Sequence, residues 1–145
     1  MEVMKGSTKI AGSISYVEQE PFIYSASIQD NILFGNEYDK ERLNDAIRYA
    51  SLTRDIELFG NGVDTVIGER GTNISGGQKA RISLARAIYN DSDIVLLDDP
   101  LSAVDPEVAS SIFNECIRGV LKDRLVILVT HQLQFLEKCE KIMLI

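Results

Sequence analysis

Apolar and polar positions along this chain follow two different periods. Residues 8–18 alternate with a period of two and are rich in β-branched and aromatic types, which is typical of a strand or a hairpin. Leu43, Ala46, Ile47 and Ala50 instead recur at the spacing of one helix face. On the same basis, helices are predicted at 28–33, 39–50, 53–59, 75–89, 106–121 and 132–138.

Two continuous apolar runs, Ile94–Leu97 and Leu125–Val129, predict strands that are buried on both faces. Residues 142–145 predict the start of another strand. In the second half of the chain, strands therefore alternate with helices. This order predicts an α/β fold with a mostly parallel sheet.

Composition narrows the class of protein. The chain has 145 residues, the size of one domain, and its net charge is -7. This charge argues against a general nucleic-acid binder, which needs an excess of basic residues to neutralise phosphates. The sequence contains no apolar run of about 18 residues or more, the length needed to span a membrane as a helix.

The segment Ser75-Gly76-Gly77-Gln78 is the first candidate site. Serine followed three residues later by glutamine predicts a capping box at a helix start, and glycines let the backbone approach a ligand closely. Free amides at a helix N-terminus attract anions such as phosphate. For the Ser-x-x-Gln pattern taken alone, an ordinary capped helix is the favoured explanation, so the segment needs support from elsewhere.

Asp98 and Asp99 follow the first buried run directly. In parallel α/β sheets, ligands bind beyond the carboxyl ends of the strands. One carboxylate there could hold Mg²⁺, and the second could orient or deprotonate a water molecule. The alternative is a polar strand end that only caps the following turn.

Two further polar residues follow predicted strands. His131, the only histidine, comes just after Leu125–Val129, and Gln19 comes after 8–18. Each could be structural, because a lone histidine or a loop glutamine usually is. An imidazole on the same sheet edge as Asp98 could instead contact a γ-phosphate.

At this point the chain resembles the nucleotide-binding domain of an ATP-binding cassette (ABC) transporter over nearly its whole length. Residues 74–78, ISGGQ, are similar to the signature motif of that family, and 94–98, IVLLD, to its Walker B strand. Residues 102–105 resemble the D-loop, His131 the switch histidine and Gln19 the Q-loop glutamine. Longer stretches, such as GERGTNISGGQKARISLARAIY and LLDDPLSAVD, resemble the first nucleotide-binding domain of the C subfamily, the multidrug-resistance-associated type.

The resemblance implies a partial P-loop NTPase-like domain over 1–145. Its helical subdomain would lie at about 22–90, and its core, from Walker B to the switch histidine, at about 91–145. It implies ATP and Mg²⁺ as cofactors. It implies two partners, a second nucleotide-binding domain paired head to tail and the transmembrane domains. The location would be the cytosolic face of a membrane.

The resemblance also implies roles for individual residues. Ser75, Gly76, Gly77 and Gln78 would contact the γ-phosphate of ATP on the partner domain. Asp98 would hold Mg²⁺, and Gln19 would sense that ion. His131 would contact the γ-phosphate, Asp99 would occupy the general-base position, and Asp105 would signal across the dimer.

Two departures from the family pattern stand out. Asp99 replaces the usual glutamate, so we expect this domain's own site to bind ATP and hydrolyse it slowly. No GxxxxGK[ST] phosphate loop occurs in the 145 residues, so we expect the isolated chain to bind ATP weakly or not at all.

Three other functions stay open from sequence. The chain could belong to the gating domain of an ATP-regulated channel of the same subfamily. It could belong to a soluble cassette ATPase, although those usually carry glutamate after the Walker B aspartate. It could also be an inert, truncated fragment.

Overall fold

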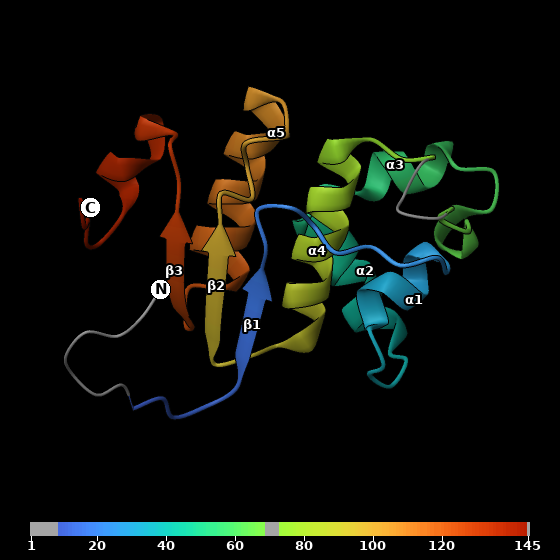
Figure 1. Ribbon diagram of the computed structural model, residues 1–145, viewed down its shortest axis with the longest axis horizontal. Coiled ribbons are helices and arrows are strands. Elements are labelled where there is room, and N and C mark those ends of the chain that lie inside the picture. Colours follow the sequence, from blue (N-terminus) through green and yellow to red (C-terminus); the bar gives the residue numbers. More distant parts are fainter. Residues whose placement is uncertain (1–8, 69–72, 145) are drawn as a thin grey trace.

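A group of helices (blue to yellow) lies to one side of a three-stranded parallel sheet, and the helical segments of the last third of the chain (orange to red) lie along the sheet and beside its far strand (Figure 1). The computed structural model describes residues 9–68 and 73–144. Its strands are β1 (Ile14–Val17), β2 (Ile94–Asp98) and β3 (Leu125–Val129). Its α-helices are α1 (Ile28–Leu33), α2 (Lys40–Tyr49), α3 (Thr53–Leu58), α4 (Gly76–Asn90) and α5 (Pro106–Ser111). Short 3₁₀ turns occur at η1 (Gly62–Asp64) and η4 (Leu133–Lys138), and η3 (Ile112–Val120) is a π-helix.

The sheet has the order β1-β2-β3, and both pairs of strands are parallel. The connection from β1 to β2 passes through α1–α4, and the connection from β2 to β3 passes through α5 and η3. The predicted α/β class and parallel sheet are confirmed. The hairpin alternative for residues 8–18 is wrong, because among its described residues only Ile14–Val17 form a strand and that strand pairs in parallel with β2.

One face of the sheet carries the core. Val17, Val95 and Leu97 are almost completely buried, in one apolar cluster with Leu84 of α4 and Phe113 of η3. The opposite face holds half-exposed apolar side chains, namely those of Ile14, Tyr16, Leu125, Ile127 and Val129. The prediction that the apolar runs are buried on both faces is therefore wrong. Within residues 9–68 and 73–144, helices pack against one face only.

Two predicted elements take a different form. The helix expected at 106–121 is α-helical only to Ser111 and continues as η3, where the amide of Leu121 donates to the carbonyl of Cys116. A side chain at Gly119 would meet the carbonyl of Asn114, so glycine fits this wider turn. Residues 142–144 do not form the expected strand, since they pair with none of the strands in the described part of the chain. No helix in that part is both long and apolar enough to cross a membrane.

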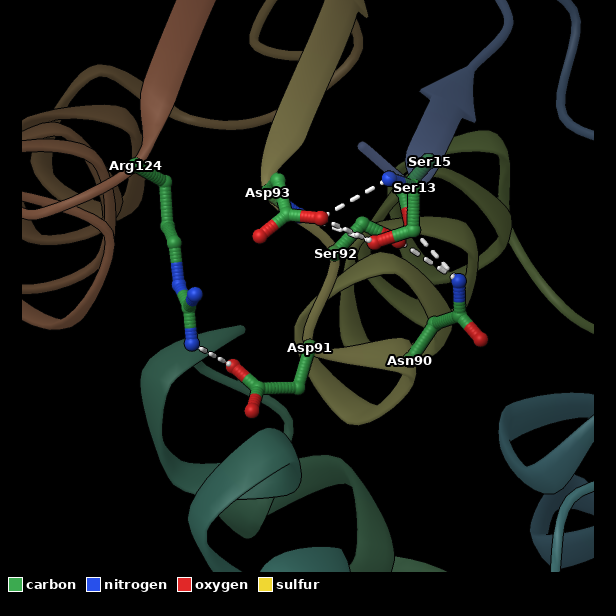
Figure 2. Close-up of polar contacts among 7 residues, drawn as sticks. All are labelled: Ser13, Ser15, Asn90, Asp91, Ser92, Asp93 and Arg124. Atoms are coloured by element: carbon green, nitrogen blue, oxygen red, sulfur yellow. Dashed lines mark hydrogen bonds and ion pairs between the residues drawn. The ribbon is translucent and has the colours of Figure 1, made fainter. Parts of the chain in front are cut away.

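A polar clasp, defined here as Ser13 with Asp93, fixes the amino end of β1 against β2 (Figure 2). Oδ2 of Asp93 accepts hydrogen bonds from the amide of Ser13 (2.8 Å) and from its hydroxyl (2.9 Å). The Asp93 amide donates back to Oγ of Ser13 at 3.1 Å. Beside the clasp, the side chain of Asn90 donates to the hydroxyl groups of Ser15 and Ser92. These contacts set the register of the two strands that carry the candidate site at their other end.

Candidate functional site

The carboxyl ends of the three strands bring four of the predicted residues to one edge of the sheet. Val17 pairs with Leu97, so Gln19 follows β1 beside the point where β2 ends at Asp98 and continues to Asp99. Asp98 in turn pairs with Val129, and His131 lies two residues beyond it. Gln19 and His131 are exposed, Asp98 is half-buried and Asp99 is buried. We call Gln19, Asp98, Asp99 and His131 the carboxylate edge.

Asp98 has one hydrogen-bond partner that the sequence did not suggest. The hydroxyl of Tyr16, on the exposed face of β1, donates to Oδ2 of Asp98 at 3.1 Å. This hydrogen bond, together with desolvation and the nearby negative charge, raises the pKa of Tyr16 above its usual value. The alternation of β1 could have placed Tyr16 next to β2, but its contact with Asp98 depends on the register. Tyr16 leaves Oδ1 of Asp98 available for another ligand.

Asp99 is held in an unusual position. Its backbone is left-handed (φ 48°), a conformation that aspartate tolerates better than most residues. Its amide donates to the carbonyl of Val129 (2.9 Å), and its carbonyl accepts from the hydroxyl of Ser102 (2.8 Å). The side chain is only 6% exposed, and its buried Oδ1 has no hydrogen-bond partner. A buried carboxylate oxygen without a partner is costly, so this atom is suited to a water molecule or a cation.

The fit to Mg²⁺ rests on these two aspartates. No cluster of three or more His, Cys, Asp or Glu side chains that could hold a metal exists in the described residues. Mg²⁺ commonly takes only one or two carboxylates from the protein and completes its shell with water and substrate phosphates. The half-buried Asp98 and the unpartnered Oδ1 of Asp99 fit this kind of site, with Asp98 as the ligand and Asp99 beside it.

Ser75 starts α4 as predicted. Its hydroxyl accepts from the amide of Gln78 (3.1 Å), and Oε1 of Gln78 accepts from the amide of Ser75 (2.8 Å). The predicted capping box is therefore confirmed. The side-chain Nε2 of Gln78 donates to Oδ1 of Asp55 in α3 at 2.8 Å. Both polar ends of Gln78 are thus used within the chain, whereas the hydroxyl hydrogen of Ser75 remains available to a ligand.

An ion pair that sequence analysis missed anchors the same helix. Arg81 contacts Asp55 at 2.9 Å, and both side chains are mostly buried. Arg81 also donates to the carbonyl of Ser51 (2.8 Å). The helix predicted at 75–89 contains Arg81, but no pattern in the sequence indicates that Asp55 of α3 is its partner. The pair holds the start of α4 against α3.

The start of α4 borders a surface cavity of about 290 Å³. Ser75, Gly76 and Gly77 line it from one side, and Ala103, Val104 and Asp105 line it from the other. Asp105 is the N-cap of α5, but its side chain makes no capping hydrogen bond. Exposed amides at the N-terminus of a 15-residue helix make this cavity favourable for an anion. We call it the signature cavity.

The predicted site residues therefore fall into two groups. Gln19, Asp98, Asp99 and His131 share the carboxylate edge, whereas Ser75, Gly76, Gly77 and Asp105 share the signature cavity. Gln78 does not line that cavity, and its side chain bonds to Ser75 and Asp55 instead. None of the four residues of the carboxylate edge lines the signature cavity. Carboxylates at the end of a central parallel strand and a helix start that favours an anion are features of α/β domains that bind phosphorylated ligands.

Comparison with known proteins defines the family. A sequence profile described as "ABC transporter" matches residues 2–102, so the chain belongs to the ABC transporter family. It is 50% identical over 97% of its length to human ATP-binding cassette sub-family C member 4. It is 48% identical over 99% to ABC transporter C family member 9 of Arabidopsis thaliana, and 52% identical over 98% to C family member 2 of Dictyostelium discoideum. The predicted resemblance to the C subfamily is confirmed, and the chain spans about a tenth of the length of these relatives.

Proposed function

We propose that this chain forms part of the nucleotide-binding domain of a C-type ABC transporter that couples ATP binding and hydrolysis to export of a substrate. The observation that carries the proposal is the division of the site residues into two separate groups. A domain that needs both groups for one ATP would bring them together. A domain that pairs head to tail with a second one would instead use each group at a different ATP.

In this arrangement the carboxylate edge serves the domain's own nucleotide. Asp98 holds Mg²⁺ and Gln19 senses it, while His131 contacts the γ-phosphate. Bound Mg²⁺ would neutralise charge on the phosphates. Asp99 takes the position of the general base. Its hydrogen-bonded backbone and buried side chain support a fixed position, but aspartate is one methylene shorter than glutamate.

The signature cavity serves the ATP of the partner domain. Ser75 and the amides of Gly76 and Gly77 contact its γ-phosphate, and Asp105 contacts the partner across the dimer. Gln78 contributes mainly by fixing the helix start, since both ends of its side chain are bonded within the chain. We propose that residues of about 22–90 form the helical subdomain and that about 91–145 belong to the core. The transmembrane domains are the second partner, which places the chain at the cytosolic face of a membrane.

The test is the Asp99→Glu variant in a full-length protein that contains this chain. Misplacing a catalytic base by about 1 Å costs on the order of a hundredfold, so the longer side chain should raise Mg-ATP turnover at this site by roughly ten- to a hundredfold. Asp99→Asn is the control, because it keeps the shorter length and removes the base. Equal turnover in the glutamate variant and the wild type would contradict the role of Asp99.

The isolated 145-residue chain provides a second test. It contains the two groups described above but no GxxxxGK[ST] loop, so titration calorimetry should detect weak Mg-ATP binding or none. Micromolar binding would show that the residues of the chain suffice for a nucleotide site, contrary to the proposal.

A further inference from the structure

The loop that joins the two groups of site residues is held from both sides. This loop, Leu101–Asp105, begins two residues after Asp99 and ends at the N-cap of α5. The side chain of Leu101 is completely buried, whereas Ser102, Ala103 and Asp105 are exposed. Val104 is half-buried and packs against the hydrophobic core, and the carbonyl of Asp105 accepts a hydrogen bond from the amide of Ala109 in α5. Two contacts to other segments, one at Ala103 and one at the carbonyl of Leu101, add to these anchors.

The first contact is with α4. A Cβ atom on Gly77 would lie 2.7 Å from the carbonyl oxygen of Ala103 and 3.6 Å from a methyl group of Val104. A Cβ on Gly76 would meet nothing within 4 Å. The two glycines of the motif thus have different surroundings. Gly77 lets the backbone of the loop lie directly against the first turn of α4, and any side chain there would push the loop away.

The second contact is with the segment that carries His131. The side-chain amide of Gln132 donates to the carbonyl of Leu101 at 2.9 Å. Its backbone amide donates to the hydroxyl of Thr130 (3.1 Å), which fixes the turn around His131. Gln132 is half-buried, so water screens this hydrogen bond less than it would at the surface. The loop is therefore bonded to the residue that follows His131.

We infer that Gly77 and Gln132 are positioning residues that clamp the Leu101–Asp105 loop between the start of α4 and the His131 segment. A displacement of the His131 segment then moves the loop, and the loop moves the start of α4. This links the carboxylate edge to the signature cavity within one chain. An effect of the clamp on ATP hydrolysis rests on the proposed function. The clamp itself is a property of the fold and can be tested without nucleotide.

Hydrogen exchange of the 145-residue chain, followed amide by amide, tests the α4 side. The amides of Ser102 and Val104 bond to the carbonyls of Asp99 and Leu101, so their exchange reports opening of the loop. Gly77→Ala should accelerate exchange of both amides by about fivefold or more, because it weakens one or two hydrogen bonds. Gly76→Ala adds the same methyl group in open space and should leave both rates unchanged.

Equal exchange in the two glycine variants would overturn the role of Gly77. Faster amide exchange spread evenly over α4 and β2 in Gly77→Ala would also overturn the role of Gly77, because it indicates global rather than local opening. If Gly77→Ala does not fold, the glutamine variants below decide the question on their own.

Gln132→Met tests the other side, since methionine keeps the length of the side chain and removes its donor. Exchange at Ser102 and Val104 should rise about fivefold. If the loop transmits the change, exchange of the Lys79 amide in the first turn of α4 should at least double. Gln134→Met is the control, because among the described residues the side chain of Gln134 bonds to Oε1 of Gln132 (3.3 Å) and not to the loop. Faster exchange in the loop with no change at Lys79 would overturn the link between the two groups.

Kinetics in a full-length protein that contains this chain separate the clamp from the proposed function. Gln132→Met should lower kcat for ATP about tenfold and leave KM within a factor of about two, as expected for lost positioning. A rise in KM with unchanged kcat would overturn a positioning role. If the wild-type protein hydrolyses no ATP, the proposed function fails, and the exchange measurements still decide the clamp.

Discussion

The helices around α4 and the three-stranded sheet are stabilised in different ways. Polar side chains join the helical region, α1–α4. Arg86 donates to the carbonyls of Asn31 within α1 and of Phe22 before it. Arg81 and Gln78 bond to Asp55 of α3, and Tyr89 accepts from the amide of Asp39. The sheet has packing on one face, an exposed apolar face opposite, and a polar clasp at its amino end. Many of the buried apolar side chains also lie in α1–α4, so in the helical region polar anchors act in addition to apolar packing. The sheet depends on packing on one face and on the clasp.

Two leucines on the sheet test the difference between its faces most strongly. Leu97 of β2 is 1% exposed within the core, whereas Leu125 of β3 is 58% exposed. Leu97→Ala should lower the free energy of unfolding by about 2–5 kcal/mol, through lost burial and the cavity left behind. Leu125→Ala should change it by less than about 0.5 kcal/mol. Urea unfolding followed by circular dichroism measures both, and similar losses would mean that the exposed face is covered in solution.

The second prediction compares a glycine of each region. Gly12 beside the clasp and Gly35 after α1 both have positive φ, 112° and 90°. A Cβ at Gly12 would lie 2.8 Å from Oδ2 of Asp93, whereas a Cβ at Gly35 would meet no atom of another segment within 4 Å. Gly35→Ala should cost about 1 kcal/mol of backbone strain. Gly12→Ala should cost about 2–3 kcal/mol, since it adds displacement of the clasp to the same strain.

The same unfolding experiment measures the glycine pair. Equal losses in both variants would show that the clasp contributes nothing beyond the backbone of Gly12. A larger loss for Gly35→Ala would show that the turn between α1 and α2, rather than the clasp, is the tighter constraint.

Local patterns predicted the elements and the sheet edge well. The helix at 28–33 and the capping box at Ser75 depend on neighbours within one turn, so the sequence contains their cause. The parallel order of the strands then places Gln19, Asp98 and His131 at one edge without further information.

Contacts between distant segments were not predictable in this way. The apolar run Leu125–Val129 has the composition of a fully buried strand, and only the packing shows that one of its faces is open. The partners Tyr16–Asp98 and Asp55–Arg81 are more than 20 residues apart in the chain. The separation of the signature cavity from the carboxylate edge depends on such contacts as well, and no motif spacing encodes it.

The third prediction concerns the polar anchors of the helical region. Nε of Arg86 donates to the carbonyl of Asn31 (2.8 Å), Nη2 donates to that of Phe22 (2.9 Å), and the guanidinium stacks 4.3 Å from the Phe34 ring. Arg86→Met should cost about 1–2 kcal/mol, because two backbone carbonyls lose a charged donor. Arg48→Met is the control. Arg48 pairs with Asp45 at the surface, and its loss should cost less than about 0.5 kcal/mol.

Arg86→Lys separates charge from geometry. Lysine keeps the charge but cannot donate to two carbonyls and stack at once, so we expect it to recover only part of the loss. Full recovery would show that the charge alone anchors the helix. Equal costs for Arg86→Met and Arg48→Met would remove the proposed contrast between the helical region and the sheet.

The smallest effect is expected from the charge of Asp93 in the clasp. The amide and then the hydroxyl of Ser13 lower the pKa of Asp93 below its ordinary value of 3.8. Because the folded-state pKa is the lower one, the ionised form stabilises the fold at pH values above about 4, and this contribution is lost as the pH falls through the folded pKa. Asp93→Asn should therefore lose stability at neutral pH and show a weaker further loss on acidification than the wild type.

Ser13→Ala refines this last comparison. The variant removes the hydroxyl but keeps the backbone amide, which is the larger cause of the shift, so the pKa of Asp93 should stay below 3.8. Titration of the Asp93 carboxyl carbon by NMR measures this directly. A return to the ordinary value in Ser13→Ala would assign the shift to the hydroxyl. An unshifted pKa of Asp93 in the wild type would mean that its ionised carboxylate does not stabilise the amino end of the sheet in solution. The sheet would then lack the kind of charged contact that Arg81 and Arg86 make in the helical region.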